Sequence, residues 1–349
     1  MYVRNCWYMA GWSHDFTTGS ITARTVIEED LAIYRKTDGT LVAMENCCCH
    51  RKAPLSVGQI EGDDIRCMYH GLKFGPDGQC NEIPQSDHVA KSVRVQTYPI
   101  FERHNAAWIW LGNPAKADPA LIPHFIGTNT PDWAMIPDRK YIDANYMLIN
   151  DNLLDLSHVS FVHRNSFGKG DAESNRAFAK AAVVNTKLPN GMRVERMNTG
   201  SATPPYIRDL LGIEAADYHT WYEFLAPGFF LLNTRIYPLG TIERCQRDMS
   251  NEKPIFAEYS CQAVTPASKD KTCYYFALGP WAQHSELAQF YLDLGHMAFD
   301  EDKVMIEAQQ KTIDRTPDKR MMNLVMDQAN FAFRALMDQL IAAEKAEAA

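Results

Sequence analysis

Two short elements that each pair a cysteine with a histidine constrain this chain more than any other feature of its sequence. The first is Cys48-Cys49-His50 and the second is Cys67-Met68-Tyr69-His70, with sixteen residues between them. Thiolate and imidazole groups are the ligands that iron and zinc commonly use in proteins. Three of the nine cysteines are consecutive, which fits a disulfide framework poorly. The pattern therefore predicts a metal centre in the first part of the chain.

Two kinds of metal centre have this ligand composition. In a [2Fe-2S] cluster of the Rieske type, two Cys bind one iron and two His bind the other, which raises the reduction potential above that of an all-Cys cluster. A structural zinc ion is the alternative, because two thiolates and two imidazoles also complete a tetrahedron. Zinc fingers usually place Cys with Cys and His with His, whereas each element here holds one of each. The spacing therefore favours the cluster.

The same spacing selects among the three consecutive cysteines. A C-x-H element that ends at His50 begins at Cys48, so Cys47 and Cys49 are not ligands. After the second element, the Gly-containing segment 71–74 predicts a tight loop that directs backbone N–H groups toward the cluster sulfurs. The predicted cluster ligands are Cys48, His50, Cys67 and His70.

A second metal-binding pattern lies in residues 152–163. It contains Asp155, His158 and His163 in the order D-x2-H-x4-H, and two His with one carboxylate form the facial triad of non-haem Fe(II) enzymes. The hydrophobic periodicity predicts a helix from Tyr146 to Val162. Side chains five residues apart diverge by about 140° on an ideal helix, so one metal binds both His only if the helix ends between them or is distorted, for which a π-bulge is the usual device. The alternative is that both His cap the helix or form hydrogen bonds in the core.

Composition excludes several other functions. Hydrophobic residues make up 46% of the chain, and the net charge is -8 with no dense run of Lys and Arg, so neither disorder nor nucleic-acid binding is expected. No apolar stretch approaches the roughly 20 residues of a membrane span, and the N-terminus lacks the pattern of a signal peptide. We therefore expect a cytoplasmic protein that binds neither nucleic acid nor membrane.

The length of the chain and its turn signals indicate two domains. Short strands and turns fill the first 110 residues, including a hairpin around Thr37-Asp38-Gly39-Thr40. Two prolines and a glycine interrupt regular structure in residues 112–119. We therefore expect an all-β domain at residues 1–115 and an α+β domain at residues 116–349.

Two helices are predicted to close the second domain. One lies near residues 285–314, and the other contains an apolar stripe from Phe333 to Ile341 at helical spacing. That stripe indicates packing against the core. Strand-like segments precede these helices around Pro189-Asn190-Gly191 and from Thr220 to Ile236.

The sequence resembles the Rieske non-haem iron oxygenases. The resemblance rests on the two Cys/His elements with their following Arg51 and Gly71-Leu72, on the opening Asn5-Cys6-Trp7-Tyr8, and on the D-x2-H-x4-H motif. The family commonly has Pro between the first Cys and His, where this chain has Cys49. The resemblance implies an α+β protein in which an all-β Rieske [2Fe-2S] domain precedes a catalytic domain with an antiparallel sheet and flanking helices.

The resemblance also implies the ligands of a mononuclear Fe(II). By the matching motif, His158 and His163 are iron ligands. The third ligand is an Asp on the late helix, where the family's E-D-x motif favours Asp302 over Asp293 and Asp300.

Two further residues near the motif receive roles, Asp155 from the resemblance and Asn152 from its spacing. Asp155 is the counterpart of a carboxylate that connects His70 of one subunit to His158 of the next, which implies a homotrimer with a head-to-tail interface. Asn152, three residues earlier, is expected to support the site by a hydrogen bond.

The electrons for such an oxygenase have to come from another protein. The chain lacks a G-x-G-x-x-G nucleotide-binding motif and any further set of four cluster-binding cysteines. We therefore expect a separate NAD(P)H-dependent reductase, and the resemblance implies that it contains a flavin and its own iron-sulfur centre.

Within the family, the length and motifs resemble the homomeric monooxygenases that include vanillate O-demethylase, dicamba O-demethylase and toluenesulfonate methyl-monooxygenase. That group implies O2 and a small aromatic acid carrying a methyl or methoxy group as substrates, and oxidative O-demethylation or methyl hydroxylation as the reaction. A ring-hydroxylating dioxygenase and a Rieske electron carrier without oxygenase activity are the alternatives.

The substrate pocket is predicted more coarsely. Its walls are expected in the segment 218–233, at Gln262 and around Tyr291. An acidic substrate requires a cationic or amide anchor, for which the unranked candidates are His219, Asn233, Arg235 and Gln262.

Overall fold

Three small antiparallel sheets form the N-terminal part of the computed structural model, which describes residues 1–125, 128–163, 166–167 and 183–348. The first sheet has the order β1 (Trp7–Trp12), β11 (Ala106–Trp110) and β10 (Ile100–Arg103). The second has the order β2 (Ile21–Val26), β3 (Glu29–Arg35), β4 (Leu41–Glu45) and β9 (Thr97–Tyr98). The third has the order β5 (Gln59–Glu61), β6 (Asp64–Arg66), β7 (Lys73–Phe74) and β8 (Cys80–Glu82).

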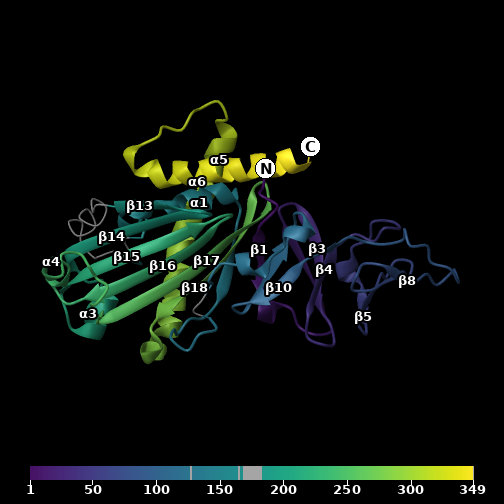
Figure 1. Cartoon of the computed structure of the whole chain (residues 1–349), viewed down its shortest axis with the longest axis horizontal. Helices are drawn as coiled ribbons and strands as arrows, with labels where there is room; N and C mark the ends of the chain where they lie inside the picture. Colours follow the sequence, from purple (N-terminus) through teal and green to yellow (C-terminus); the bar gives the residue numbers. More distant parts are fainter. Residues whose placement is uncertain (126–127, 164–165, 168–182, 349) are drawn as a thin grey trace.

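The predicted hairpin at Thr37–Thr40 is confirmed, since β3 and β4 pair on either side of it in antiparallel register. The third sheet, β5 to β8, forms one end of the long molecule, away from the large sheet of the second half (Figure 1). The two predicted Cys/His elements follow β4 and β6, so both belong to this end of the structure.

One large antiparallel sheet forms the second half of the described chain. Its strand order is β12 (Asp138–Ile142), β18 (Lys271–Pro280), β17 (Phe256–Ser268), β16 (Phe229–Tyr237), β15 (Ala215–Leu225), β14 (Gly191–Ala202) and β13 (Val183–Leu188). The helices are α1 (Tyr146–Leu154), α3 (Pro205–Leu211), α4 (Thr241–Arg244), α5 (Ala288–Arg315) and α6 (Gln328–Ala348). This arrangement confirms the predicted α+β class and the all-β character of the first part.

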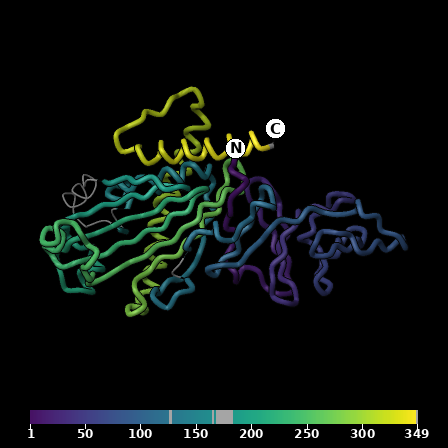
Figure 2. The backbone as a smooth tube through the Cα atoms, viewed as in Figure 1, coloured from purple at the N-terminus to yellow at the C-terminus, as the bar shows by residue number. Residues whose placement is uncertain are grey.

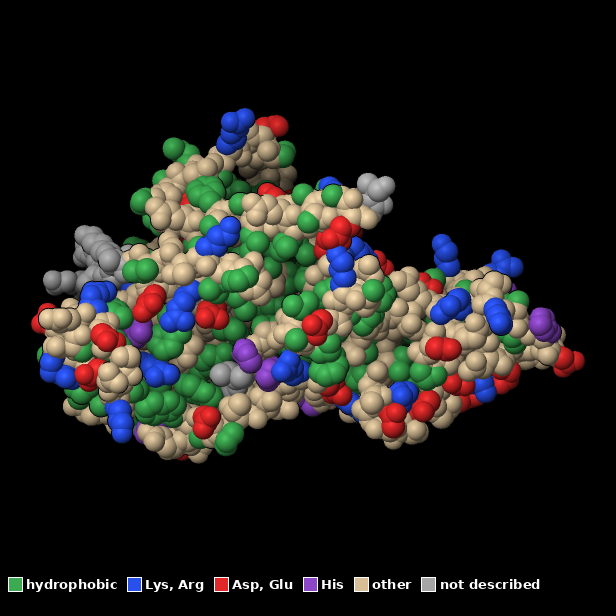
Figure 3. Space-filling view, in the orientation of Figure 1, with side chains coloured by type: hydrophobic (Ala, Val, Ile, Leu, Met, Phe, Trp, Pro, Cys, Tyr) green, Lys and Arg blue, Asp and Glu red, His purple; other side chains and the backbone are tan. Residues whose placement is uncertain are grey.

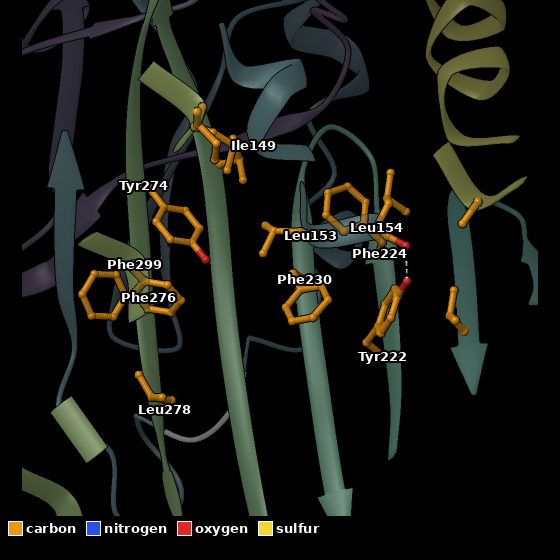
Figure 4. Packing of buried hydrophobic residues seen from close by; sticks show 14 of the residues in the cluster. Ile149, Leu153, Leu154, Tyr222, Phe224, Phe230, Tyr274, Phe276, Leu278 and Phe299 are labelled. Carbon is orange, nitrogen blue, oxygen red and sulfur yellow. Dashed lines mark hydrogen bonds between the residues drawn. The ribbon is translucent and has the colours of Figure 1, made fainter. Parts of the chain in front are cut away.

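The two faces of the large sheet are covered by different parts of the chain. On one face, a single hydrophobic cluster joins the sheet to α1, α5 and α6, and the predicted stripe of α6 takes part through Phe333 and Met337, which are buried. Figure 4 shows Leu153 of α1 above Phe230 in this cluster, and Phe276 and Phe299 farther along the sheet, with their rings edge to face at a centroid distance of 4.7 Å. On the other face, tryptophans of the first sheet pack against β16, β17 and β18. The large sheet is therefore the layer that both halves of the molecule share.

The two ends of the chain lie side by side. The tube in Figure 2 places the end of α6 next to the N-terminus. The Glu344 carboxylate accepts hydrogen bonds from the backbone N–H groups of Arg4, at 2.9 and 3.0 Å, and of Asn5, at 2.5 Å. The last helix thus fastens the first residues of the N-terminal half to the second half.

The distribution of charged side chains on the surface and the character of the helices both bear on possible partners. On the face seen in Figure 3, acidic and basic side chains are interspersed rather than gathered by sign. None of the helices in the described part of the chain has the length and apolar character needed to span a membrane.

The helix predicted from Tyr146 to Val162 is shorter in the structure. α1 ends at Leu154, and Asp155 adopts extended dihedral angles (φ -122°, ψ 90°) before a 3₁₀ turn, Leu156–Ser160. The Asp155 carboxylate accepts hydrogen bonds from the backbone N–H and the hydroxyl of Ser157, both at 2.9 Å. A side-chain acceptor of this kind begins a new turn, so hydrophobic periodicity alone overestimated the helix. Of the two arrangements expected to bring both His to one metal, the structure has a helix end, here followed by a 3₁₀ turn, rather than a π-bulge.

A buried carboxylate connects the two halves of the molecule. Asp15 follows β1, and its side chain is 6% exposed. It accepts hydrogen bonds from the Trp12 backbone N–H at 3.1 Å, from Arg24 at 3.2 Å, and from Arg139 of β12. Burial alone raises the pKa of Asp15, but the bonds to Arg139 and Arg24 outweigh it and hold the pKa below its usual value.

We predict that Asp15→Asn destabilises the protein by about 1–3 kcal/mol, because it leaves two partly buried guanidinium groups without their charged partner. Urea unfolding at pH 7 measures this as a lowered midpoint. Since the folded-state pKa is depressed, the contribution is present above pH ~4 and is lost as the pH falls through the lowered pKa. The matched control is Asp143→Asn, whose pair with Lys271 is 72% and 70% exposed and contributes little. Equal midpoints for Asp15→Asn and the wild type would contradict the prediction.

Candidate metal centres and active site

The two Cys/His elements form loops with the same backbone hydrogen bonds. The N–H of Cys48 donates to the carbonyl oxygen of Ala53 at 2.9 Å, and the N–H of Cys67 donates to that of Leu72 at 2.8 Å. In both cases the acceptor lies five residues after the Cys. The structure therefore brings two equivalent loops together from β4 and β6.

A second shared bond closes each loop. The N–H groups of Lys52 and Gly71, each four residues after its Cys, donate to the Cys carbonyl oxygen at 2.9 Å. Both residues have left-handed backbone angles, with φ of 58° and 80°, a conformation that glycine adopts freely and other residues rarely. Lys52 shows that the turn accepts another residue, whereas a Cβ at Gly71 would lie 2.7 Å from Pro84 Cγ, so the close approach of Pro84 favours glycine in the second loop.

Burial separates the two kinds of ligand in these loops. Cys48 and Cys67 are 1% and 2% exposed, whereas His50 and His70 are exposed, with ring centroids 4.5 Å apart. Burial raises the pKa of Cys48 to about 12, and the backbone of His50 hydrogen-bonds to its thiol, which acts in the opposite direction. Such a thiol becomes a thiolate when a metal cation lies beside it. The loops fit a cluster with two buried Cys ligands and two His ligands at the surface.

The structural-zinc alternative does not fit these loops. A tetrahedral zinc ion keeps its four ligand atoms within about 4 Å of one another. Across the described ranges, the group of three or more ligand atoms that all lie within 4.8 Å of one another is His158, His163 and Asp302. The Cys and His side chains of the two loops are more widely spaced, as a two-iron cluster requires.

His158, His163 and Asp302 converge on one point. The Nε2 atoms of the two His are 3.3 Å apart, and they lie 3.7 and 3.3 Å from the two carboxylate oxygens of Asp302. Ligands about 2.1 Å from a metal and at right angles to one another are about 3 Å apart. The three side chains therefore fit one face of the coordination shell of a mononuclear iron and leave the other positions open.

The outward-facing ring nitrogens of both His are held by oxygen atoms. His158 Nδ1 lies 2.6 Å from the carbonyl oxygen of Asp155, and His163 Nδ1 lies 3.0 Å from the carboxylate of Glu301. Ser166 donates to the same carboxylate at 2.7 Å. An Nδ1–H donor bond directs Nε2 toward the metal position and sets the tautomer.

The titration behaviour of the two imidazoles differs. Burial lowers the pKa of His158, which favours the neutral imidazole that binds metals. For His163, burial acts to lower the pKa, but its hydrogen bonds to Asp302 and Glu301 outweigh burial and raise the pKa. The carboxylates around His163 make its imidazole the more basic of the two.

The other two residues singled out in the motif contact this group. The Asn152 amide donates to Asp302 Oδ1 at 2.9 Å, so the expected supporting hydrogen bond is present. Asp155 has two structural contacts, with Ser157 through its carboxylate and with His158 through its carbonyl oxygen.

A largely apolar cavity opens beside the metal-binding group. Its volume is about 180 Å³, and His158, His163 and Asp302 form part of its wall. Of the expected wall positions, Tyr218, Thr220, Gln262 and Tyr291 line it. The apolar lining includes Leu153, Leu156, Phe167, Phe230, Leu232 and Leu278.

Three of the four expected substrate anchors do not line the cavity. His219, Asn233 and Arg235 are directed to the other face of the sheet, because successive side chains of a strand alternate between faces. His219 instead bonds to Glu195 there, at 2.6 Å. Only Gln262 of that group faces the cavity.

Two acidic residues of the site were absent from the sequence-based set. Glu301 precedes Asp302 and orients His163, and Glu258 on β17 lines the cavity. The E-D motif that indicated Asp302 also contains Glu301. Glu258 could not be predicted, because strand alternation shows which residues face a cavity only when the register of β17 against its neighbours is known.

Comparisons with known proteins agree with this geometry. Residues 6–99 match the Rieske [2Fe-2S] domain, and residues 142–343 match the vanillate O-demethylase oxygenase C-terminal domain. A Rieske domain joined to a catalytic domain with two His and one Asp around an open site defines a Rieske non-haem iron oxygenase. The chain belongs to the vanillate O-demethylase type of this family.

Several relatives match along their whole length. The iron-sulfur subunit of the toluene-4-sulfonate monooxygenase system of Comamonas testosteroni is 34% identical over 99% of this chain and 98% of its own. A vanillate O-demethylase oxygenase subunit of a Pseudomonas species is 28% identical over 99% and 96%. The crystal structure of dicamba monooxygenase bound to 3,6-dichlorosalicylic acid superposes with a TM-score of 0.87, 26% identity, and coverage of 100% of this chain and 99% of that one.

We predict that Asp302→Asn lowers the content of mononuclear iron by at least about tenfold, because an amide oxygen is a far weaker ligand than a carboxylate. Iron analysis after dialysis measures the loss, and the visible spectrum of the cluster is the internal control. Asp300→Asn is the matched control, since Asp300 is 61% exposed and pairs with Lys140. Retention of mononuclear iron in Asp302→Asn, or its loss in Asp300→Asn, would contradict the assignment.

Proposed function

We propose that this chain is the oxygenase component of a multicomponent monooxygenase that hydroxylates a methyl or methoxy group of an aromatic compound. The observation that supports this most directly is the position of His158, His163 and Asp302, which lie in the wall of an apolar cavity in a chain that also contains a Rieske domain. The relatives named above act on aromatic compounds, as their names state.

The proposal assigns a role to each part of the chain. His158, His163 and Asp302 would hold the iron, which supplies the activation of O2 when it is bound. Asn152 holds Asp302, and Glu301 holds His163, in the orientations that coordination requires. The apolar walls exclude water from the reacting carbon and position the substrate ring. The residues that would hold the [2Fe-2S] cluster are Cys48, His50, Cys67 and His70.

The proposed reaction balances with one NAD(P)H. For a methoxy substrate, R–OCH3, O2, NAD(P)H and a proton give R–OH, formaldehyde, water and NAD(P)+, because the hydroxylated methoxy carbon is a hemiacetal that releases formaldehyde. For a ring methyl group, the product is the hydroxymethyl compound and water. We infer that a separate reductase containing flavin and an iron-sulfur centre delivers both electrons, and that the enzyme acts in the cytoplasm, where NAD(P)H is formed.

We further propose the expected domain division at residue 115 and a homotrimer. β11 ends at Trp110 and pairs with β1, whereas the next strand, β12, pairs with β18 of the large sheet. The cluster loops lie toward the end of the molecule formed by β5 to β8, remote from the large sheet (Figure 1). This separation supports electron transfer between neighbouring subunits, with Asp155 connecting His70 of one to His158 of the next.

We predict that Asp155→Asn keeps the mononuclear iron and the cluster but lowers turnover at least about hundredfold, because an amide does not replace a charged acceptor between two imidazoles. Product formed in one turnover by chemically reduced protein measures the step without the reductase. Ser157→Ala is the control, since it removes a bond to Asp155 but keeps its charge. Wild-type turnover in Asp155→Asn would refute the proposed connection.

The experiment that tests the function is oxygen uptake with formaldehyde detection, using iron-loaded protein, NADH and a surrogate reductase. Methoxy- and methyl-substituted aromatic compounds form the panel. We expect formaldehyde in step with oxygen for methoxy compounds, and a hydroxymethyl product without formaldehyde for methyl compounds. His158→Ala should abolish both while keeping the cluster spectrum. A cis-dihydrodiol product would identify a ring-hydroxylating dioxygenase instead. If no tested compound stimulates oxygen uptake, the chain is a Rieske electron carrier without oxygenase activity.

A further inference from the structure

A chain of three hydrogen-bonded side chains leads from the core of the catalytic half to the wall of the cavity. Tyr274 of β18 donates its hydroxyl hydrogen to Oε1 of Gln262, and Nε2 of Gln262 donates to Oγ of Ser260 at 2.8 Å. Gln262 and Ser260 lie on β17 and line the cavity, whereas Tyr274 belongs to the hydrophobic cluster beside it. Within the described residues, none of the three hydrogen-bonds to an iron ligand, so the proposed reaction does not yet give the chain a role.

The buried phenol sets the direction of these hydrogen bonds. Tyr274 is 3% exposed, and burial raises its pKa well above the usual range, so the hydroxyl stays protonated. A phenol has one hydrogen to donate, and the Gln262 amide is the partner of that hydroxyl in the described part of the chain. The amide therefore turns its oxygen to Tyr274 and its nitrogen to Ser260. A reversed amide would bury the phenol hydrogen without an acceptor, which is unfavourable.

The Ser260 hydroxyl ends the chain as a donor. Its oxygen accepts from Gln262, and its own hydrogen has no acceptor within hydrogen-bond distance among the described residues. In the sheet register, Ser260 lies between Leu232 of β16 and Leu278 of β18, which also line the cavity. The wall thus presents one oriented hydroxyl between two apolar side chains.

The bond that this hydroxyl can form depends on the ligand. Ser260 is 6% exposed and Gln262 is 4% exposed, and the amide is bonded at both of its ends, so neither side chain turns freely. An aromatic ring that fills the cavity displaces the water that would otherwise accept from Ser260. A ligand with an oxygen atom at that position replaces the lost bond, whereas an apolar ligand of the same shape leaves the hydroxyl without an acceptor.

We propose that Ser260 is a specificity-determining residue that selects substrates with an oxygen acceptor, a carbonyl or a carboxylate, on the aromatic ring. Gln262 and Tyr274 are positioning residues that act through Ser260. This inference rests on the proposed function and narrows its substrate class. Of the four expected substrate anchors it keeps Gln262, and it adds the hydroxyl that Gln262 orients.

Three ligands of similar shape, each with a methoxy group, test the proposal: 4-methoxyacetophenone, 4-methoxybenzoate and 4-isopropylanisole. The ketone and the benzoate carry oxygen where the isopropyl compound carries methyl groups. Anaerobic calorimetry on the iron-loaded, cluster-containing protein without reductase measures binding without turnover. The tighter-binding of the ketone and the benzoate identifies the acceptor as neutral or anionic.

Ser260→Ala removes the hydroxyl and little else. We expect it to weaken binding of the preferred acceptor ligand at least about fivefold and to change binding of the isopropyl compound less than about twofold. Ser268→Ala is the matched control, because Ser268 lies on the same strand and does not line the cavity. Unchanged binding of the ketone and the benzoate in Ser260→Ala, equal weakening of all three ligands, or binding of none of them to the wild type would overturn the proposal.

Tyr274→Phe removes only the phenol oxygen and tests the positioning role. We expect it to weaken the preferred acceptor ligand at least about threefold, while the isopropyl compound binds as before and the iron content is retained. A general loss of packing would weaken all three ligands alike. An unchanged preference for the acceptor ligand in Tyr274→Phe would exclude the positioning role.

The role of Ser260 and the proposed function fail separately. Binding that depends on Ser260, without formaldehyde from the complete system, would refute the proposed function and leave the role of Ser260 standing. Formaldehyde formed from the ketone and the benzoate with the same kcat/KM by the wild type and Ser260→Ala would refute the role of Ser260 and leave the proposed function standing.

Discussion

The break in the backbone at Asp155 is the constraint on which the catalytic centre depends. A continuous helix would direct His158 and His163 about 140° apart. The Asp155 carboxylate begins a 3₁₀ turn by accepting from Ser157, and its carbonyl oxygen orients the His158 ring. The turn that follows brings the second His to the same point. A short polar side chain at a helix end thus converts a sequence with helical periodicity into a metal-binding group.

The large antiparallel sheet gives this centre its surroundings. One face packs against the tryptophan-rich sheet of the N-terminal half, and the other encloses the cavity together with residues of α1, α3 and α5. Both Asp302 of the metal-binding group and Tyr291 of the cavity wall lie on α5, so a single helix positions two parts of the cavity.

The Rieske half and the catalytic half differ in how their ligands are assembled. Each cluster loop is a local turn closed by its own backbone bonds, so its Cys and His are close in sequence and in space. The mononuclear centre combines a local pair of His with an Asp more than a hundred residues later. The first kind of centre is recognisable from spacing, whereas the second needs the packing of α5 against α1 and the sheet.

Local patterns in the sequence predicted the cluster ligands and the two His of the second motif, and they were sufficient for the hairpin at Thr37–Thr40 and for the two closing helices, because short-range spacing determines turns and helix periodicity. Spacing did not decide which of Asp293, Asp300 and Asp302 is the third iron ligand. The family resemblance favoured Asp302, which the packing of α5 brings next to His158 and His163. Only the tertiary structure decided which strand residues face the cavity. The expected substrate anchors His219, Asn233 and Arg235 lie on the other face of the sheet, whereas Glu258, which was not expected, lines the cavity. The physical reason is that strand register is set by pairing between distant segments, and a shift of one residue exchanges the two faces of a strand.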